Sequence, residues 1–136
     1  MGLKWIDDYN VGVSAIDNQH KELFNRANQL FEAMKSGKGS EHAESVLKFL
    51  ASYVQEHFRE EEQMMAKSGY PELASHKRAH GEFIKTFSQL VEEFREKGTD
   101  TLLSIKIQRT VAGWLIDHIV REDRKAGLHL SRQKAA

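Results

Sequence analysis

Residues 46–65 read VLKFLASYVQEHFREEEQMM, and this stretch decides the fold. Its apolar residues recur every three or four positions, which is the period of one face of an α-helix. The stripe consists of Val46, Leu47, Leu50, Tyr53, Val54, His57, Glu61, Met64 and Met65. His57 and Glu61 are four residues apart, so a helix aims both of them toward the side that it buries. Because a buried polar group is costly unless it is paired or bound to a metal, the stripe predicts a partner for this pair.

Three other segments have the same helical period, and no segment alternates at the period of a strand. Short breaks that contain glycine, proline and capping residues separate the segments, and Pro71 suits the first position of the third helix. Breaks this short make successive helices antiparallel neighbours. The sequence therefore predicts an all-α fold, an antiparallel up-down-up-down four-helix bundle with an N-terminal arm. The helices are expected at about residues 16–36, 40–67, 71–97 and 100–126.

The chain of 136 residues has the length of one domain, and we expect a single domain over residues 1–136. Residues 1–15 are expected to form the arm, which packs on the bundle of residues 16–126. Gly127 is expected to end the last helix, because glycine is common just after a helix C-terminus. Residues 127–136 are then expected to be a polar, frayed tail.

Composition excludes several classes of site and partner. The chain has no cysteine, so any transition metal must be held by histidine and carboxylate. Twenty basic and twenty acidic residues cancel, so neither nucleic acid nor an anionic membrane is an expected partner. No apolar run has the length of a membrane span, and the acidic start of the chain is unlike a signal peptide. We expect a cytoplasmic protein.

Polar residues interrupt the apolar stripe of all four predicted helices. They are His20, His57, Glu61, His76, His80, His118 and an acid shortly after His118. They occur near the start of the first and third helices and near the end of the second and fourth. In an antiparallel bundle all of these positions lie at the same end, so we expect one buried metal site there. His42 and His129 lie outside this set, and we expect both to be solvated and without function.

Two acids of the fourth helix compete for a place in this site. Glu122 follows His118 by four residues and Asp123 follows it by five. Helical spacing alone favours Glu122 as the partner on the same face. Asp123 would require a different angle of approach or a distorted helix end. Spacing leaves the two alternatives open.

The number of candidate ligands fits a pair of metal ions. Two six-coordinate ions need about twelve ligand positions. Five histidines, two bridging carboxylates and one bridging solvent oxygen leave one of about twelve positions open. A small molecule such as dioxygen could bind at that open position.

Several short motifs in order resemble those of the bacterial members of the hemerythrin family, which bind oxygen at a non-haem di-iron centre. The resemblance covers about residues 5–125 and rests on Trp5, Val11-Gly12-Val13, Ile16-Asp17-Asn18-Gln19-His20, His57-Phe58-Arg59-Glu60-Glu61, Tyr70-Pro71 followed by His76 and His80, and Trp114-Leu115-Ile116-Asp117-His118-Ile119 with Asp123. It implies two iron ions that share a bridging oxo or hydroxo group. The implied ligands are His76, His80 and His118 for one iron, His20 and His57 for the other, and Glu61 and Asp123 as bridges. The resemblance thus favours Asp123 over Glu122.

The resemblance also implies a function. Dioxygen is expected to bind reversibly at the iron with two histidines, for oxygen storage, transport or delivery to an oxygen-consuming partner enzyme. The residues expected around the dioxygen pocket are Leu23, Phe58, Trp114, Leu115 and Ile119. We expect a monomer rather than an oligomer, and an oxygen-binding protein rather than an enzyme. The alternatives are a di-iron oxidase or peroxidase, whose bundles usually carry paired Glu-x-x-His motifs that this chain lacks, and an oxygen or iron sensor that acts through a partner.

Overall fold

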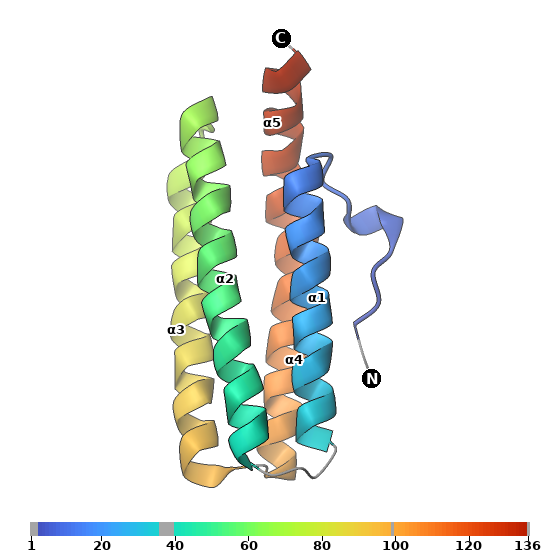
Figure 1. Cartoon of the computed structure of the whole chain (residues 1–136). Coiled ribbons are helices and arrows are strands. Elements are labelled where there is room, and N and C mark those ends of the chain that lie inside the picture. Colours follow the sequence, from blue (N-terminus) through green and yellow to red (C-terminus); the bar gives the residue numbers. More distant parts are fainter. Residues whose placement is uncertain (1–2, 36–39, 99, 136) are drawn as a thin grey trace.

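Every regular element that the structure describes is helical, and four long helical rods lie side by side (Figure 1). The computed structural model describes residues 3–35, 40–98 and 100–135, and the side chains of these residues except at 40–42, 101 and 133–135. The elements are the 3₁₀-helix η1 (Asp7–Tyr9), α1 (Ser14–Lys35), α2 (Ser40–Ser68), α3 (Leu73–Lys97), α4 (Thr101–His118), the π-helix η2 (Ile119–Asp123) and α5 (Arg124–Ala135). The predicted all-α class is confirmed.

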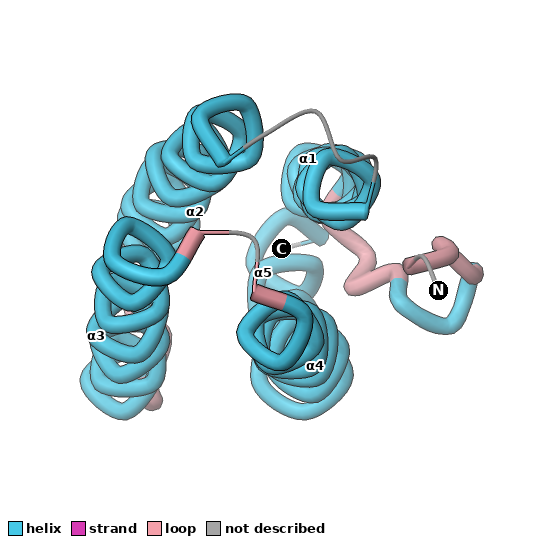
Figure 2. The backbone as a smooth tube through the Cα atoms, turned by 90° about the horizontal axis from the view of Figure 1, so that it is seen from below, coloured by secondary structure: helices cyan, strands magenta, loops and turns pink. Residues whose placement is uncertain are grey.

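The rods are arranged as an antiparallel four-helix bundle. Seen along the bundle axis, α1, α2, α3 and α4 occupy the four corners, and each helix packs against its neighbours in the chain (Figure 2). The contact of α1 with α4 closes the ring. The helices α4, η2 and α5 follow one another as a single rod, which extends past the start of α1 (Figure 1). The predicted up-down-up-down order is therefore confirmed.

The breaks between helices follow the local chemistry of the sequence. Gly98 adopts a φ of 69° after α3, and its N–H donates to the carbonyl of Phe94 at 2.8 Å. The Asp100 carboxylate then accepts a hydrogen bond from the N–H of Leu103 at 3.0 Å and caps α4. The expectation for Pro71 was wrong, because a turn holds it and α3 begins two residues later at Leu73.

The expectation that Gly127 ends the last helix was also wrong. Gly127 lies inside α5, which continues to Ala135. A Cβ atom at this position would lie 2.1 Å from the carbonyl oxygen of Val11. Glycine is therefore needed here because the arm crosses the helix at very short range, and a helix tolerates glycine at a cost of about 1 kcal/mol.

The expected frayed tail is instead part of the packed structure as far as it is described. Leu130 is buried in the main apolar cluster. The ring of His129 lies near that of Tyr70 and its Nε2 donates to the carbonyl of Ser68 at 3.1 Å, so His129 is not simply solvated. The side chain of His42 lies outside the described residues.

The N-terminal arm lies along the outside of α1 (Figure 1). The backbone of Leu3 exchanges two hydrogen bonds with the side-chain amide of Asn28, at 2.7 and 2.8 Å. Trp5 packs edge-on against Tyr9 and Phe24. The arm thereby packs along α1, the helix that carries His20, as far as Asn28.

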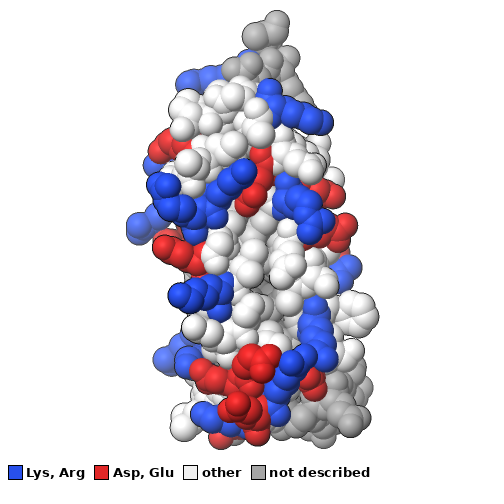
Figure 3. Space-filling model, turned by 90° about the vertical axis from the view of Figure 1, so that its left-hand side faces the viewer, with Lys and Arg blue, Asp and Glu red and all other residues white. Residues whose placement is uncertain are grey.

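Charged residues lie on the outer faces of the bundle. On the face formed by α2 and α3, positive and negative side chains are interspersed on both sides of an uncharged strip (Figure 3). A groove between α2 and α3 is lined by residues that include Ala51, Ile84 and Phe87. Among the described helices, none is long and apolar enough to cross a membrane. Charged side chains on a surface are expected, whereas the buried polar residues of the interior need an explanation.

Candidate metal centre

Seven polar side chains from four rods meet inside the bundle. Each of them exposes between 1% and 5% of its surface. They lie at the end where α2 turns into α3, as the antiparallel order predicts. They are His20 on α1, His57 and Glu61 on α2, His76 and His80 on α3, His118 on α4 and Asp123 on η2.

Glu61 lies between two groups of histidines. Its Oε1 is 2.7 Å from Nε2 of His76 and 3.3 Å from Nε2 of His80. Its Oε2 is 3.2 Å from Nε2 of His57 and 3.6 Å from Nε2 of His20. The two oxygens of one carboxylate therefore point at different nitrogen groups.

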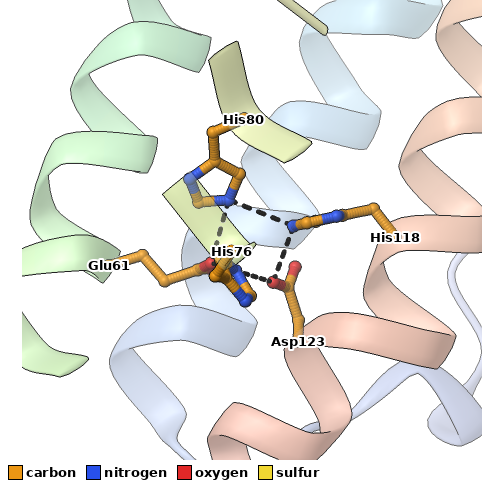
Figure 4. Close-up of side chains that lie close together, drawn as sticks. All are labelled: Glu61, His76, His80, His118 and Asp123. Atoms are coloured by element: carbon orange, nitrogen blue, oxygen red, sulfur yellow. Dashed lines mark hydrogen bonds and ion pairs between the residues drawn. The ribbon is translucent and has the colours of Figure 1, made fainter. Parts of the chain in front are cut away.

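Asp123 repeats this arrangement from the opposite rod (Figure 4). Its Oδ1 is 3.0 Å from Nε2 of His76 and 3.1 Å from Nε2 of His118, whereas its Oδ2 is 3.1 Å from Nε2 of His20. Two sets of potential ligands result, and both contain Glu61 and Asp123. We call the nitrogens of one set the three-histidine group (His76, His80 and His118) and those of the other the two-histidine group (His20 and His57).

The π-helix η2 explains why Asp123 rather than Glu122 points inward. Five residues of an α-helix advance about 140° past a full turn, which would turn Asp123 away from the face of His118. In η2 the N–H of Arg124 donates to the carbonyl of Ile119, five residues back, and this wider turn brings residue i+5 over residue i. Asp123 is 2% exposed and Glu122 only partly buried. The structure thus brings together the set that the resemblance implied.

Two hydrogen-bond partners behind the histidines were missed in the sequence. Nδ1 of His57 lies 2.6 Å from Oε1 of Gln19, and Nδ1 of His80 lies 2.7 Å from Oε2 of Glu62. Gln19 in turn donates from its Nε2 to Glu60. Gln19 and Glu62 each neighbour a member of the polar set in the chain, and this adjacency is the only signal that could have suggested them.

The buried carboxylates and histidines strongly favour each other's charged forms. Burial lowers the pKa of His20, but the nearby carboxylates of Asp123 and Glu61 outweigh burial and raise that pKa to about 9. The same balance raises the pKa of His76 to about 9. Burial and the nearby Glu61 raise the pKa of Asp123, but the close imidazoles of His118, His20 and His76 outweigh them and lower it to about 2. The set therefore attracts positive charge, either protons or metal ions.

The residues expected around a dioxygen pocket are all at least partly buried. Phe58 stacks on the ring of His80 with centroids 3.7 Å apart, and Trp114 stacks on His118 at 4.3 Å. These two rings therefore lie against the three-histidine group. The other three belong to the apolar cluster and expose at most 2% of their surface; they are Leu23, Leu115 and Ile119.

The set fits metal ions better than it fits hydrogen bonding alone. Both ring nitrogens of His20, Oε2 of Glu61 and Oδ1 of Asp123 are buried and make no hydrogen bond. Nε2 of His80 and Nε2 of His118 face each other at 3.0 Å, close enough for one cation to bind both. Buried polar atoms are costly without a partner, and cations at this centre would bind Nε2 of His20, Oε2 of Glu61 and Oδ1 of Asp123.

A family model for the hemerythrin HHE cation binding domain matches residues 11–127. The chain belongs to the hemerythrin family. A bacteriohemerythrin of Stenotrophomonas maltophilia is 34% identical over 122 residues, which are 90% of this chain and 77% of that protein. A bacteriohemerythrin of Clostridium acetobutylicum is 34% identical over 127 residues, covering 89% of this chain and 95% of that protein. The resemblance of the motifs to hemerythrins is thereby confirmed.

Solved structures agree with this assignment. A crystal structure of wild-type hemerythrin superposes with a TM-score of 0.85 at 30% sequence identity. The match covers 95% of this chain and 98% of the other. The similarity to hemerythrin therefore extends over nearly the whole chain.

Proposed function

We propose that this protein binds dioxygen reversibly at a non-haem di-iron centre held by the seven buried side chains. The observation that carries the proposal is the sharing of both carboxylates by unequal histidine groups. One metal position has three nitrogens and two oxygens at hand, and the other has two of each. A bridging oxo or hydroxo group would add one ligand to each position. Six-coordinate iron would then have one open place, beside His20 and His57.

The chain's own residues supply binding, orientation and exclusion of water. Glu61 and Asp123 would neutralise charge at both metal positions, because the two oxygens of each carboxylate face different histidine groups. The histidines add nitrogen ligands, which suit iron, from four helices, α1 to α4. The packing of Phe58 and Trp114 against the histidine rings keeps bulk water from the three-histidine group. When bound, iron supplies the electrons that dioxygen binding requires.

The donor set favours carriage of oxygen over oxidation of a substrate. Di-iron enzymes of similar bundles use a carboxylate-rich set with paired Glu-x-x-His motifs. Here five imidazoles and two carboxylates face the centre. We therefore propose that the protein stores oxygen or delivers it to an oxygen-consuming enzyme, acts as a monomer, and is not itself an enzyme.

Stopped-flow spectroscopy of the reduced, iron-loaded protein tests this proposal. Iron content is measured first, and fewer than about two irons per chain would contradict the ligand set. Mixing with oxygen should produce a charge-transfer band, and removal of oxygen should abolish it. Rapid irreversible oxidation, or turnover with peroxide, would favour an oxidase or peroxidase instead.

A further inference from the structure

The outer nitrogens of two histidines have different kinds of partner. Nδ1 of His57, in the two-histidine group, faces the amide oxygen of Gln19 at 2.6 Å. Nδ1 of His80, in the three-histidine group, faces the carboxylate of Glu62 at 2.7 Å. One partner is neutral and the other carries a negative charge. The two halves of the centre therefore differ outside their ligands as well as within them.

The hydrogen bonds fix the tautomer of His57. Gln19 donates its Nε2 hydrogen to Glu60, because a carboxylate can only accept. Its Oε1 is therefore the atom that faces His57, and Nδ1 of His57 must donate. Nε2 of His57 is then left with a lone pair and points toward Glu61 at 3.2 Å. Glu60 thus acts on the two-histidine group through an intervening amide.

His80 is held in the same tautomer by a charged group. The carboxylate of Glu62 accepts from Nδ1 of His80 without an intervening amide, and Glu62 is 24% exposed while His80 is 1% exposed. A hydrogen bond to an ionised acceptor is roughly twice as strong as one between neutral groups. It also raises the basicity of the imidazole at its other nitrogen. Nε2 of His80 therefore donates its electron pair to a metal ion more strongly than Nε2 of His57 does.

We propose that Glu62 and Gln19 are positioning residues that make the two metal positions unequal. Glu62 strengthens metal binding at the three-histidine group through His80. Gln19 leaves His57 a weaker electron-pair donor to the metal, so the metal position at the two-histidine group holds its ion less tightly. This inference rests on the proposed di-iron centre. It goes further by assigning roles to residues that do not touch the metal, so its failure would leave the centre itself intact.

The test is a titration of the metal-free protein with Zn²⁺ or Co²⁺, which avoids redox chemistry. Wild-type protein should bind two ions in a tighter and a weaker step. Glu62→Gln should weaken the tighter step by about 10- to 100-fold and leave the weaker step unchanged, since loss of an outer partner typically has this effect. Glu62→Asp should restore part of the loss. Glu56→Gln removes an exposed charge from the same helix and is the matched control.

A charge-conserving exchange tests the other half. The double variant Gln19→Glu with Glu60→Gln places the carboxylate directly behind His57 and keeps the amide next to it. The weaker step should then become tighter, and the ¹⁵N resonance of Nδ1 of His57 in the zinc-loaded protein should move toward that of His80. If Glu62→Gln does not fold, this double variant decides the question alone.

The outcomes separate the two levels of the argument. Fewer than two ions bound by the wild type would overturn the proposed centre. Two ions bound by the wild type, with both steps and the ¹⁵N resonances unchanged in the variants, would overturn the roles of Glu62 and Gln19 only. Equal weakening by Glu56→Gln would also overturn them, because it would mean that general charge loss causes the effect.

Discussion

The assignment of Asp123 rather than Glu122 can be tested by a matched pair of isosteric variants. Asp123→Asn preserves the volume of the side chain but replaces one acceptor oxygen by a donor. Glu122→Gln makes the same chemical change one residue earlier, on a side chain that is only partly buried. If η2 directs Asp123 into the centre, only the first variant should affect metal binding.

The structure sets the size of the expected effect. Asp123 lies within 3.1 Å of the Nε2 atoms of His20, His76 and His118. Breaking a buried ion pair costs about 3–5 kcal/mol, and the lower end applies because the imidazoles can release their protons. For a domain of this size about 3 kcal/mol lowers the melting temperature of the metal-free protein at pH 6 by about 10 °C.

Metal content gives the second measurement on the same variants. The two-histidine group has the fewest ligands and should lose its metal first when Asp123 is altered. Iron in Asp123→Asn should fall from about two to about one per chain, and the charge-transfer band formed with oxygen should disappear. Asp123→Asn with two irons and the wild-type band, or Glu122→Gln with iron lost, would refute the reasoning from the π-helix.

Three further predictions follow from the geometry. His118→Ala should remove one iron and the oxygen-dependent band, as measured by metal analysis and absorption; unchanged spectra would contradict its role. Metal-free protein should be most stable between about pH 4 and 6.5. The raised pKa of His20 gives stability that is lost as pH rises toward about 9, and the lowered pKa of Asp123 gives stability that is lost as pH falls toward 2. Melting temperatures that rise from pH 6.5 to 9 would refute this. Gly127→Ala should cost about 1–3 kcal/mol with iron content unchanged, because its Cβ meets the carbonyl of Val11; an unchanged melting temperature would show that the arm can move away.

Most of the fold could be predicted from the sequence because periodicity and breaks agreed. The stripe around Leu50 and Val54 predicted α2, and the glycine and capping residue at Gly98 and Asp100 predicted the start of α4 within a residue or two. Gly127 misled the prediction for a physical reason. A glycine that ends a helix and one that admits a crossing backbone look identical in sequence, and only the path of the arm distinguishes them.

The candidate site could be predicted as far as it depends on which side of its helix a residue lies and on its position along the bundle axis. Glu61 follows His57 by one helical turn, so their common face could be read directly. The choice of Asp123 could not, because a π-turn changes the face of every residue after it and leaves no mark in the spacing. The partners Gln19 and Glu62 were missed because the direction of a ring nitrogen depends on side-chain rotation, which spacing does not specify.

The π-helix links the metal centre to the packing of the N-terminal arm. A π-turn is rare and occurs often at functional sites, where its irregular geometry needs a compensating gain. Here the turn brings the carboxylate of Asp123 between the two histidine groups while α5 continues beyond it as a regular helix. Gly127, four residues further on, then meets the arm at Val11. A deletion within η2 that restored α-helical geometry would thus move the carboxylate of Asp123 or shift the contact of Gly127 with Val11. The metal centre and the arm therefore both constrain the segment from η2 to Gly127.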